Sequence, residues 1–163
     1  MYRATVPSPL GLLTLYSDGT AITAITMPVW RYQPPSGSIV SDDLPVFQKA
    51  KEWLEKYFTG VAPDAYPPIH TFGTPFQQQV WHILQEIPPG TALTYGEIAR
   101  KLEETTGRRT SPRAIGNAVG RNPVAIMIPC HRVLGADGRP TGFGGGLEAK
   151  RFLLELEGIS YRC

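Results

Sequence analysis

The spacing of apolar residues changes near residue 70, and no other feature of the sequence constrains the fold more strongly. Before this point, short runs rich in β-branched residues alternate with turn residues, which is typical of a small antiparallel sheet. After it, apolar residues recur every three or four positions, as they do along one face of a helix. We therefore expect an α/β domain with its connecting loop at residues 1–70 and a helical domain at residues 71–163.

The first domain is expected to hold an antiparallel sheet covered by one helix. The predicted strands lie at residues 2–6, 12–17 and 21–27. Asp18-Gly19 is a favourable hairpin turn between the last two strands. Apolar residues at helical spacing predict a helix over residues 47–57, and Gly60 ends it. Residues 31–41 are rich in proline and glycine, so we expect a loop there.

Two capping boxes begin helices in the second domain, Thr74 with Gln77 and Thr94 with Glu97. The predicted helices lie at residues 74–87, 94–104, 111–121 and 147–157. A short polar turn joins the second of these to the third, which indicates a helix-turn-helix. The 17 glycines and 16 prolines of the chain agree with short elements and many shaped turns.

The predicted helix at residues 111–121 is unusually poor in side chains. Its small residues are Ala114, Gly116, Ala118 and Gly120. A glycine inside a helix costs about 0.5–1 kcal/mol relative to alanine, so the two glycines need a reason. Two reasons stay open: tight packing against a neighbouring helix, or close approach to a nucleic-acid groove into which Arg113 is carried.

Positive charge gathers in the second half of the chain. Residues 100–139 hold eight basic side chains against three acidic ones, although the net charge of the whole chain is only +2. This segment is either a nucleic-acid footprint or a solvated basic surface.

The compartment and the cysteine count narrow the classes of protein further. No apolar run approaches the about 18 residues of a membrane-spanning helix, and residues 1–10 lack the pattern of a signal peptide, so we expect a cytoplasmic protein without membrane contact. The two cysteines cannot build a disulfide framework, and no Cys-x-x-Cys pair offers a zinc site. We expect no metal.

The segment at residues 122–133 carries the strongest chemical signal. It is apolar and therefore expected to be buried, and it places Cys130 between a rigid proline and the basic pair His131-Arg132. Nearby positive charge lowers a thiol pKa from about 8.5, and the thiolate is the nucleophilic form. Cys130 is thus a candidate nucleophile, with a buried structural cysteine as the alternative. Cys163, at the terminus, is expected to be exposed and incidental.

These motifs resemble those of the O6-alkylguanine-DNA alkyltransferases, the methylated-DNA–protein-cysteine S-methyltransferases. The resemblance rests on Ile-Pro-Cys-His-Arg-Val at 128–133, Arg-Ala-Ile-Gly-Asn-Ala-Val-Gly-Arg-Asn-Pro at 113–123 and Gly-Phe-Gly-Gly-Gly-Leu at 142–147, and also on Thr-Pro-Phe-Gln-Gln-Gln-Val-Trp at 74–81 and Tyr-Gly-Glu-Ile-Ala at 95–99. It covers residues 74–158, whereas residues 1–70 agree mainly in size and pattern.

The resemblance implies an N-terminal α/β domain of ribonuclease-H-like shape and a C-terminal winged helix-turn-helix domain that enters the minor groove of double-stranded DNA. Such a protein flips O6-alkylguanine out of the duplex and transfers the alkyl group irreversibly to its own Cys130. Each molecule would act once and would need no cofactor. We expect a monomer in solution that binds duplex DNA in a salt-sensitive manner, with cooperative assembly along it.

The resemblance also implies roles for individual residues. His131, positioned by Glu157, would draw the proton from Cys130, while Asn122 would hold the turn before the reactive segment and Tyr95 would donate a proton to the departing base. Arg113 would fill the space that the flipped base leaves. The candidate DNA contacts are Thr94, Tyr95, Ser111, Arg113, Ala114, Gly116, Ala118 and Arg121, and the candidate pocket residues are Val133, Phe143, Gly144 and Gly145.

Two features depart from the family pattern. Phe143 stands where many relatives have tyrosine, so the pocket lacks one hydroxyl. The turn at residues 103–110 is longer than usual and brings in Arg108 and Arg109, which would add phosphate contacts.

The sequence leaves three other functions open. A sensor that binds alkyl lesions without transfer would lack the reactive thiol, so Cys130 argues against it. A thiol hydrolase using Cys130, His131 and Glu157 would need an oxyanion hole, which no motif announces. A transcription regulator would read bases with Asn, Gln and Arg along its recognition helix, whereas residues 114–118 are mostly small or apolar.

Overall fold

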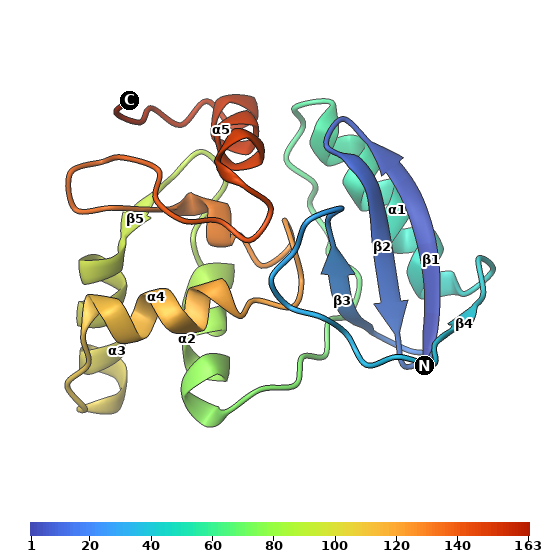
Figure 1. The fold of residues 1–163 in the computed structure, drawn as a ribbon, viewed down its shortest axis with the longest axis horizontal. Coiled ribbons are helices and arrows are strands. Elements are labelled where there is room, and N and C mark those ends of the chain that lie inside the picture. The colour runs from blue at the N-terminus through green and yellow to red at the C-terminus, as the bar shows by residue number, and fades with distance from the viewer. The chain divides into compact units, whose positions relative to one another are not determined.

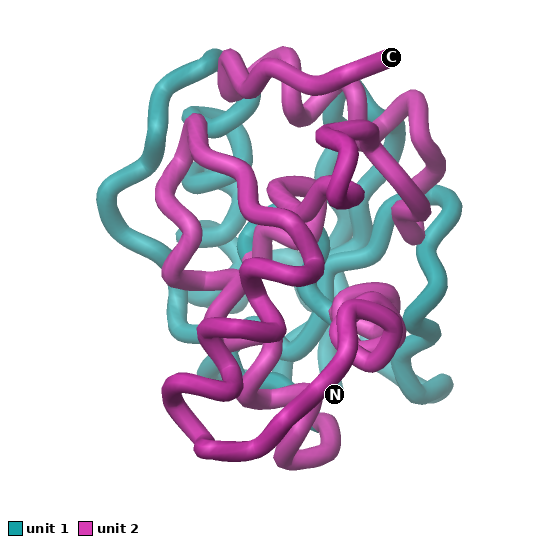
Figure 2. Tube along the Cα trace, turned by 90° about the vertical axis from the view of Figure 1, so that its left-hand side faces the viewer, with its two compact units in different colours: residues 1–72, 123–127 teal, residues 73–122, 128–163 magenta.

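The computed structural model describes residues 1–163 and contains five α-helices, six strands and one short 3-10 helix (Figure 1). The chain divides into two compact units (Figure 2). The first unit comprises residues 1–72 and 123–127, and the second comprises residues 73–122 and 128–163.

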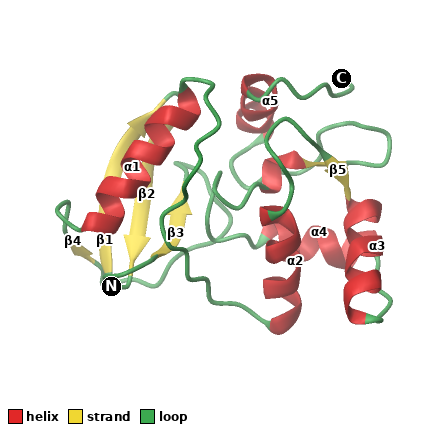
Figure 3. Cartoon of the chain, turned by 180° about the vertical axis from the view of Figure 1, so that it is seen from behind, coloured by secondary structure: helices red, strands yellow, loops and turns green.

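The first unit is a four-stranded sheet with one helix packed against it (Figure 3). Its elements are β1 (Tyr2–Ser8), β2 (Gly11–Ser17), β3 (Ile22–Thr26), β4 (Ile39–Val40) and α1 (Pro45–Phe58). The strand order is β3-β2-β1-β4, with β1–β2 and β2–β3 antiparallel and β4 parallel to β1. The predicted sheet-plus-helix pattern is confirmed.

The hairpin between β2 and β3 forms as the sequence predicts. The Asp18 carboxylate accepts hydrogen bonds from the backbone N–H groups of Thr20 and Ala21, at 2.9 and 3.0 Å. These bonds lower the pKa of Asp18 to about 2. Gly19 adopts a φ of 111°, a left-handed conformation that glycine tolerates best.

The expectation of a loop throughout residues 31–41 is wrong for β4. The N–H groups of Ile39 and Ser41 donate to the carbonyls of Met1 and Arg3, each at 3.0 Å, so this short segment extends the sheet at the β1 edge. Only two residues pair, and both are exposed. So short a strand shows no alternation of apolar and polar residues that a sequence pattern could detect.

Apolar burial between α1 and the sheet stabilises the first unit. Phe47 on α1 and Leu13, Leu15 and Ile25 on the strands are completely shielded from solvent. Trp53 stacks on Tyr57, one turn further along α1, with ring centroids 5.3 Å apart. The helix therefore buries one continuous apolar face on β1, β2 and β3.

Residues 123–127 belong to the first unit, although the sequence analysis assigned them to the second domain. Ile25 donates its N–H to the Pro123 carbonyl and accepts at its own carbonyl from the N–H of Ala125, both at 3.0 Å. This parallel bridge lies beside β3. Every residue from 123 to 127 is buried, so the apolar run finds its partner in the sheet core.

The second unit is built from short helices. Its elements are α2 (Pro75–Gln85), β5 (Leu93–Thr94), α3 (Tyr95–Thr106), α4 (Pro112–Gly120), the 3-10 helix Cys130–Arg132, β6 (Val133–Leu134) and α5 (Leu147–Leu156). Helices α2, α3 and α4 pack against one another, and β5 pairs in parallel with β6. The helix pair α3–α4 and the two-unit architecture agree with the predicted fold class.

The predicted start signals are present in the second unit. Thr74 and Thr94 each form a complete capping box, and the Ser111 hydroxyl accepts from the N–H of Ala114 at 3.1 Å. Gly107 ends α3 in a left-handed conformation with a φ of 72°. No helix is both long enough and apolar enough to cross a membrane.

Candidate active site

Cys130 is the first residue of the 3-10 helix, and only 4% of it is exposed. Asn122 holds the segment before it, since its side-chain amide donates to the Ile128 carbonyl at 2.8 Å. The same side chain also hydrogen-bonds the Cys130 thiol. Asn122 thus positions both the turn and the sulfur, at the place where the sequence analysis expected it to hold the turn.

Between Asn122 and Cys130 the backbone takes an uncommon conformation. Ile126 has a φ of 71°, which is rare for a β-branched residue because its side chain crowds the preceding carbonyl. Such strain persists only where the surrounding structure enforces it. Ile126 is 1% exposed, so the packed core supplies that enforcement.

Glu157, at the C-terminal cap of α5, binds two consecutive residues of the 3-10 helix. Its Oε2 lies 2.5 Å from Nε2 of His131, and its Oε1 accepts from Nε of Arg132 at 2.7 Å. The three side chains are at most 5% exposed. The expected pairing of His131 with Glu157 is therefore present as a buried contact.

Burial sets the protonation of His131. Loss of water lowers the pKa of the imidazole, while the hydrogen bond and charge of Glu157 raise it, and the lowering prevails. A neutral imidazole is favoured, which is the form that can accept a proton. The arrangement suits a general base next to a thiol.

The electrostatic expectation for Cys130 itself is wrong. Burial raises the pKa of the thiol, and the hydrogen bond from Asn122 and the charge of Lys150 only offset part of this effect. Removing water from a thiolate outweighs the neighbouring positive charge. The resting group is therefore the thiol, and its reaction requires a base.

Lys150 on α5 is a member of this cluster that the sequence analysis missed. It is completely buried, and its ammonium donates to the carbonyls of Val133 and Thr141 at 2.5 and 2.9 Å. Burial lowers the pKa of Lys150 to about 8. One signal could have found it, because Lys150 lies three and four residues before Leu153 and Leu154, which are buried on the apolar face of the helix.

Tyr95 begins α3 and lies near the cluster. Its hydroxyl accepts from the Thr141 hydroxyl at 3.3 Å. Burial raises the pKa of Tyr95, and the charge of Cys130 adds to that effect. A tyrosine that keeps its proton is suited to donate a hydrogen bond to a bound group.

The remaining candidate pocket residues lie close to these groups in the chain. Val133 is completely buried, and its carbonyl accepts from Lys150. Phe143, Gly144 and Gly145 are half-buried in the loop before α5, where the N–H of Gly146 donates to the Phe143 carbonyl at 3.0 Å.

The candidate DNA-binding residues divide into exposed and buried groups. Ser111, Arg113 and Arg121 are exposed at the ends of α4, while Thr94, Ala114 and Gly116 are half-buried. Ala118 is only 3% exposed, and its carbonyl accepts from Nε1 of Trp81 at 2.9 Å. The side chain of Ala118 therefore packs inside the unit and is not on the exposed face with Arg113.

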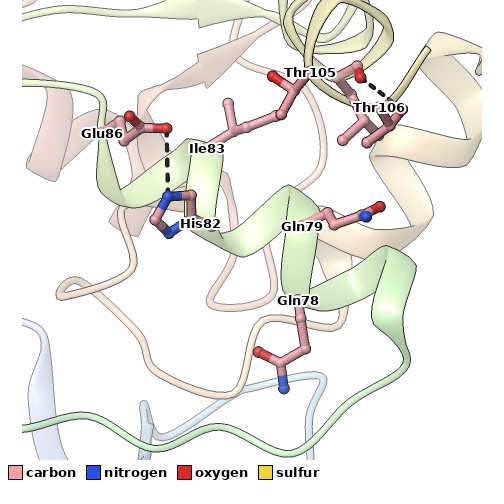
Figure 4. Close-up of a pocket in the computed structure, with 8 residues that line it drawn as sticks. Gln78, Gln79, His82, Ile83, Glu86, Thr105 and Thr106 are labelled. Carbon is pink, nitrogen blue, oxygen red and sulfur yellow. Dashed lines mark hydrogen bonds and ion pairs between the residues drawn. The ribbon is translucent and has the colours of Figure 1, made fainter. Parts of the chain in front are cut away.

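Side chains of α2 and α3 also line a groove. Figure 4 shows its lining side chains, including His82 and Glu86, whose Nε2 and Oε1 atoms lie 3.8 Å apart. Both of these side chains are about 70% exposed or more, so their pairing is screened by solvent. The lining includes none of the residues around Cys130. Nowhere in the chain do three His, Cys, Asp or Glu side chains gather as metal ligands.

Fold and site together define a class of protein: an α/β unit joined to a helix-turn-helix unit that carries a buried Cys–His–Glu cluster. Sequence models of two domains match the chain. The 6-O-methylguanine DNA methyltransferase ribonuclease-like domain matches residues 1–64, and the DNA-binding domain of the same name matches residues 75–159. The chain belongs to the 6-O-methylguanine DNA methyltransferase family.

Individual relatives agree with this membership. A Haemophilus influenzae methylated-DNA–protein-cysteine methyltransferase is 48% identical over 99% of this chain and 88% of its own length. A Methanosarcina acetivorans protein of the same name is 39% identical over 97% and 99%. The structure of Mycobacterium tuberculosis OGT in complex with DNA matches with a TM-score of 0.88 at 41% identity, over 97% of this chain and 93% of that one.

Proposed function

We propose that this protein repairs O6-alkylguanine in DNA by moving the alkyl group onto Cys130. The observation that carries the proposal is the buried thiol of Cys130 next to His131, whose Nε2 lies 2.5 Å from Glu157. Family membership supplies the substrate class, since the relatives act on methylated DNA by their names. No cofactor enters the proposed reaction.

The first step is removal of the thiol proton. Nε2 of His131 faces Glu157, so Nδ1 is the ring atom that takes the proton from Cys130, directly or through one water. The Glu157 carboxylate then stabilises the imidazolium. The positive charge of Lys150 favours the thiolate. This base is needed because burial raises the pKa of the thiol.

The second step is a single in-line displacement at the alkyl carbon. The Cys130 sulfur forms the new C–S bond while the C–O6 bond breaks, and its electron pair goes to the guanine. The anion of guanine is a poor leaving group, so a proton or hydrogen bond from Tyr95 assists its departure. The products are guanine and an alkylated cysteine, which has no thiol left for a second turnover.

The DNA is proposed to lie along α4 with the minor groove facing it. Arg113, exposed at the start of α4, fills the space left by the flipped nucleotide and offsets part of the few kcal/mol that flipping costs. Thr94, Ser111, Ala114 and Arg121 contribute contacts around it. The basic side chains Arg108 and Arg109, exposed in the α3–α4 turn, contact phosphates.

Gly116 favours this placement of the DNA over simple helix packing. A Cβ built at Gly116 would stand 3.7 Å from the Tyr95 ring, which is ordinary van der Waals contact. Packing within the unit thus does not require glycine at this position. Close approach of the sugar–phosphate backbone gives a reason for it. We propose double-stranded DNA as the partner of a cytoplasmic protein that is monomeric in solution and assembles cooperatively on DNA.

Intact-protein mass spectrometry tests the transfer. After incubation with duplex DNA containing O6-methylguanine, we expect a gain of one methyl mass, about 14 Da, that persists in Cys163→Ser and vanishes in Cys130→Ser. Cys163 is an exposed thiol and serves as the matched control. Lesion binding without any adduct would indicate a sensor, and neither binding nor adduct would return the thiol hydrolase to consideration.

A further inference from the structure

We propose that Arg132 is a positioning residue for alkyl transfer, which holds the Glu157 carboxylate toward His131 and ties the pair to the C-terminal end of α2. This inference rests on the proposed function. It assigns a role to a side chain that the mechanism above does not use.

The two oxygens of Glu157 have separate donors. Oε2 pairs with His131, whereas Oε1 accepts from Nε of Arg132 at 2.7 Å and from the N–H of Gly90 at 3.2 Å. Rotation of the carboxylate would break the contacts of both oxygens together. Charge-assisted bonds of this length are among the stronger hydrogen bonds in proteins. Glu157 is thus locked in the orientation that serves His131.

The second contact of Arg132 anchors this arrangement to another element. Nη1 donates to the Ile87 carbonyl at 2.6 Å, two residues beyond the end of α2. Residues 88–90 then turn back, so that the N–H of Gly90 also reaches Glu157. The planar guanidinium fork can serve the carboxylate and the carbonyl at once, which the single ammonium of lysine does less well.

His131 and Arg132 are neighbours in one 3-10 turn, so their side chains reach opposite oxygens of one carboxylate. A displaced Arg132 would move the shared partner of His131. Arg132 is only 2% exposed, and a buried charge is costly unless it is paired. The ion pair therefore stabilises a fixed geometry around the proposed base.

The charge of Arg132 also bears on His131. Three charged groups face this imidazole: Glu157, whose charge raises the pKa of His131, and Arg132 and Lys150, whose charges lower it. Loss of the Arg132 charge should raise the pKa of His131. A reaction that needs neutral His131 would then lose rate at a higher pH than in the wild type.

The test measures single-turnover methyl transfer from an O6-methylguanine duplex between pH 5 and 9. We expect Arg132→Met to slow transfer at least tenfold and to move the acidic limb of the rate profile to higher pH. Arg132→Lys should keep the limb in place, because the charge remains, but still lose rate because one of the two contacts is lost. Lys51→Met, which removes a cation of the first unit paired with Asp42 at 3.9 Å, should behave as wild type.

A second readout separates failure of this proposal from failure of the proposed function. The ¹⁵N chemical shifts of the His131 ring report its titration without any transfer. A wild type that transfers nothing, with a His131 titration that still follows Arg132, would overturn the function and retain the positioning role.

Coincident pH profiles and His131 titrations in wild type and Arg132→Met would overturn the positioning role. If Arg132→Met does not fold, the transfer rate of Arg132→Lys tests the positioning role in its place. A wild-type transfer rate in Arg132→Lys would show that the forked geometry has no part in the reaction.

Discussion

The sheet core of the first unit and the cluster around Cys130 are equally shielded from solvent but consist of different chemistry. Phe47 and its neighbours on β2 and β3 are apolar, whereas His131, Arg132 and Lys150 are polar or charged and no more than 2% exposed. Burial of apolar groups stabilises a fold, while burial of charges costs free energy that partners must offset. The contrast indicates that the apolar core stabilises the fold, whereas the cluster around Cys130 holds reactive groups in fixed positions.

The largest effect on stability is expected in the apolar core. Phe47→Ala should lower the free energy of unfolding by about 3–5 kcal/mol, because a large cavity replaces a fully packed ring. Methyl transfer per folded molecule should remain near the wild-type rate. Urea unfolding and a transfer assay on the folded fraction check both. Phe72→Ala, at a residue 55% exposed, should change stability by less than about 0.5 kcal/mol.

The largest effect on chemistry is expected in the Cys130 cluster. Glu157→Gln keeps an acceptor near His131 but removes its charge, so the single-turnover transfer rate should fall about 100-fold. Glu155→Gln, at a carboxylate that accepts from the Tyr161 hydroxyl at the surface, should leave the rate unchanged. Equal transfer rates in Glu157→Gln and wild type would contradict the proposed contrast between the two buried regions, because the buried charge of Glu157 would then have no role in the reaction.

The pH dependence of stability should reveal Lys150. Its pKa is lowered to about 8 in the fold, from 10.5 in an unfolded chain, so the unfolded state binds more protons between these values. Stability contributed by this group therefore rises with pH across that window, by about 2 kcal/mol near pH 10. Cys130 acts in the opposite direction, because its raised pKa makes the folded state retain a proton that the unfolded chain releases.

A Cys130→Ser background removes that opposing titration. Comparing it with Cys130→Ser/Lys150→Met by urea unfolding at pH 7.5 and pH 10 isolates the lysine. The rise in stability with pH should be larger when Lys150 is present. Parallel pH curves for the two proteins would mean that Lys150 is not held in a desolvated state.

The smallest expected effect separates the two explanations for α4. Gly116→Ala should raise the free energy of unfolding by about 0.5–1 kcal/mol, because alanine is a better helix former and its Cβ meets the Tyr95 ring at ordinary distance. Affinity for duplex DNA should fall because the added methyl meets the groove. Fluorescence anisotropy with a labelled duplex measures this. A more stable protein with unchanged DNA affinity would favour helix packing as the reason for glycine.

Local signals in the sequence predicted most of the fold. The capping boxes at Thr74 and Thr94 predicted two helix starts, because such a box needs only four neighbouring residues. Asp18-Gly19 predicted a hairpin for the same reason, since a turn is also a local feature of the sequence. No local signal predicted β4, because its pairing depends on β1, which is far away in the sequence. The pairing of residues 123–127 with β3 was not predicted either, since an apolar run does not show which sheet it joins.

The site was predicted unevenly for a related reason. Motif order placed His131 and Glu157 in one cluster, and the structure shows that contact. Lys150 looked like one charged residue on an amphipathic helix, and only the carbonyls of Val133 and Thr141, which converge from two other segments, reveal why it is buried. The sign of the pKa shift of Cys130 depends on complete burial, which a sequence does not quantify.

The β-bridge between Ile25 and Val124 holds the chain in place a few residues before Cys130. The nucleophile lies only three residues after Met127, the last residue that belongs to the first unit. Backbone hydrogen bonds to the sheet fix the start of the segment at residues 123–132. The contacts of Glu157 with His131 and Arg132 fix its end. The conformation of the chain around Cys130 therefore depends on contacts that precede it in the first unit and on contacts that follow it in the second, besides the residues that touch the sulfur itself.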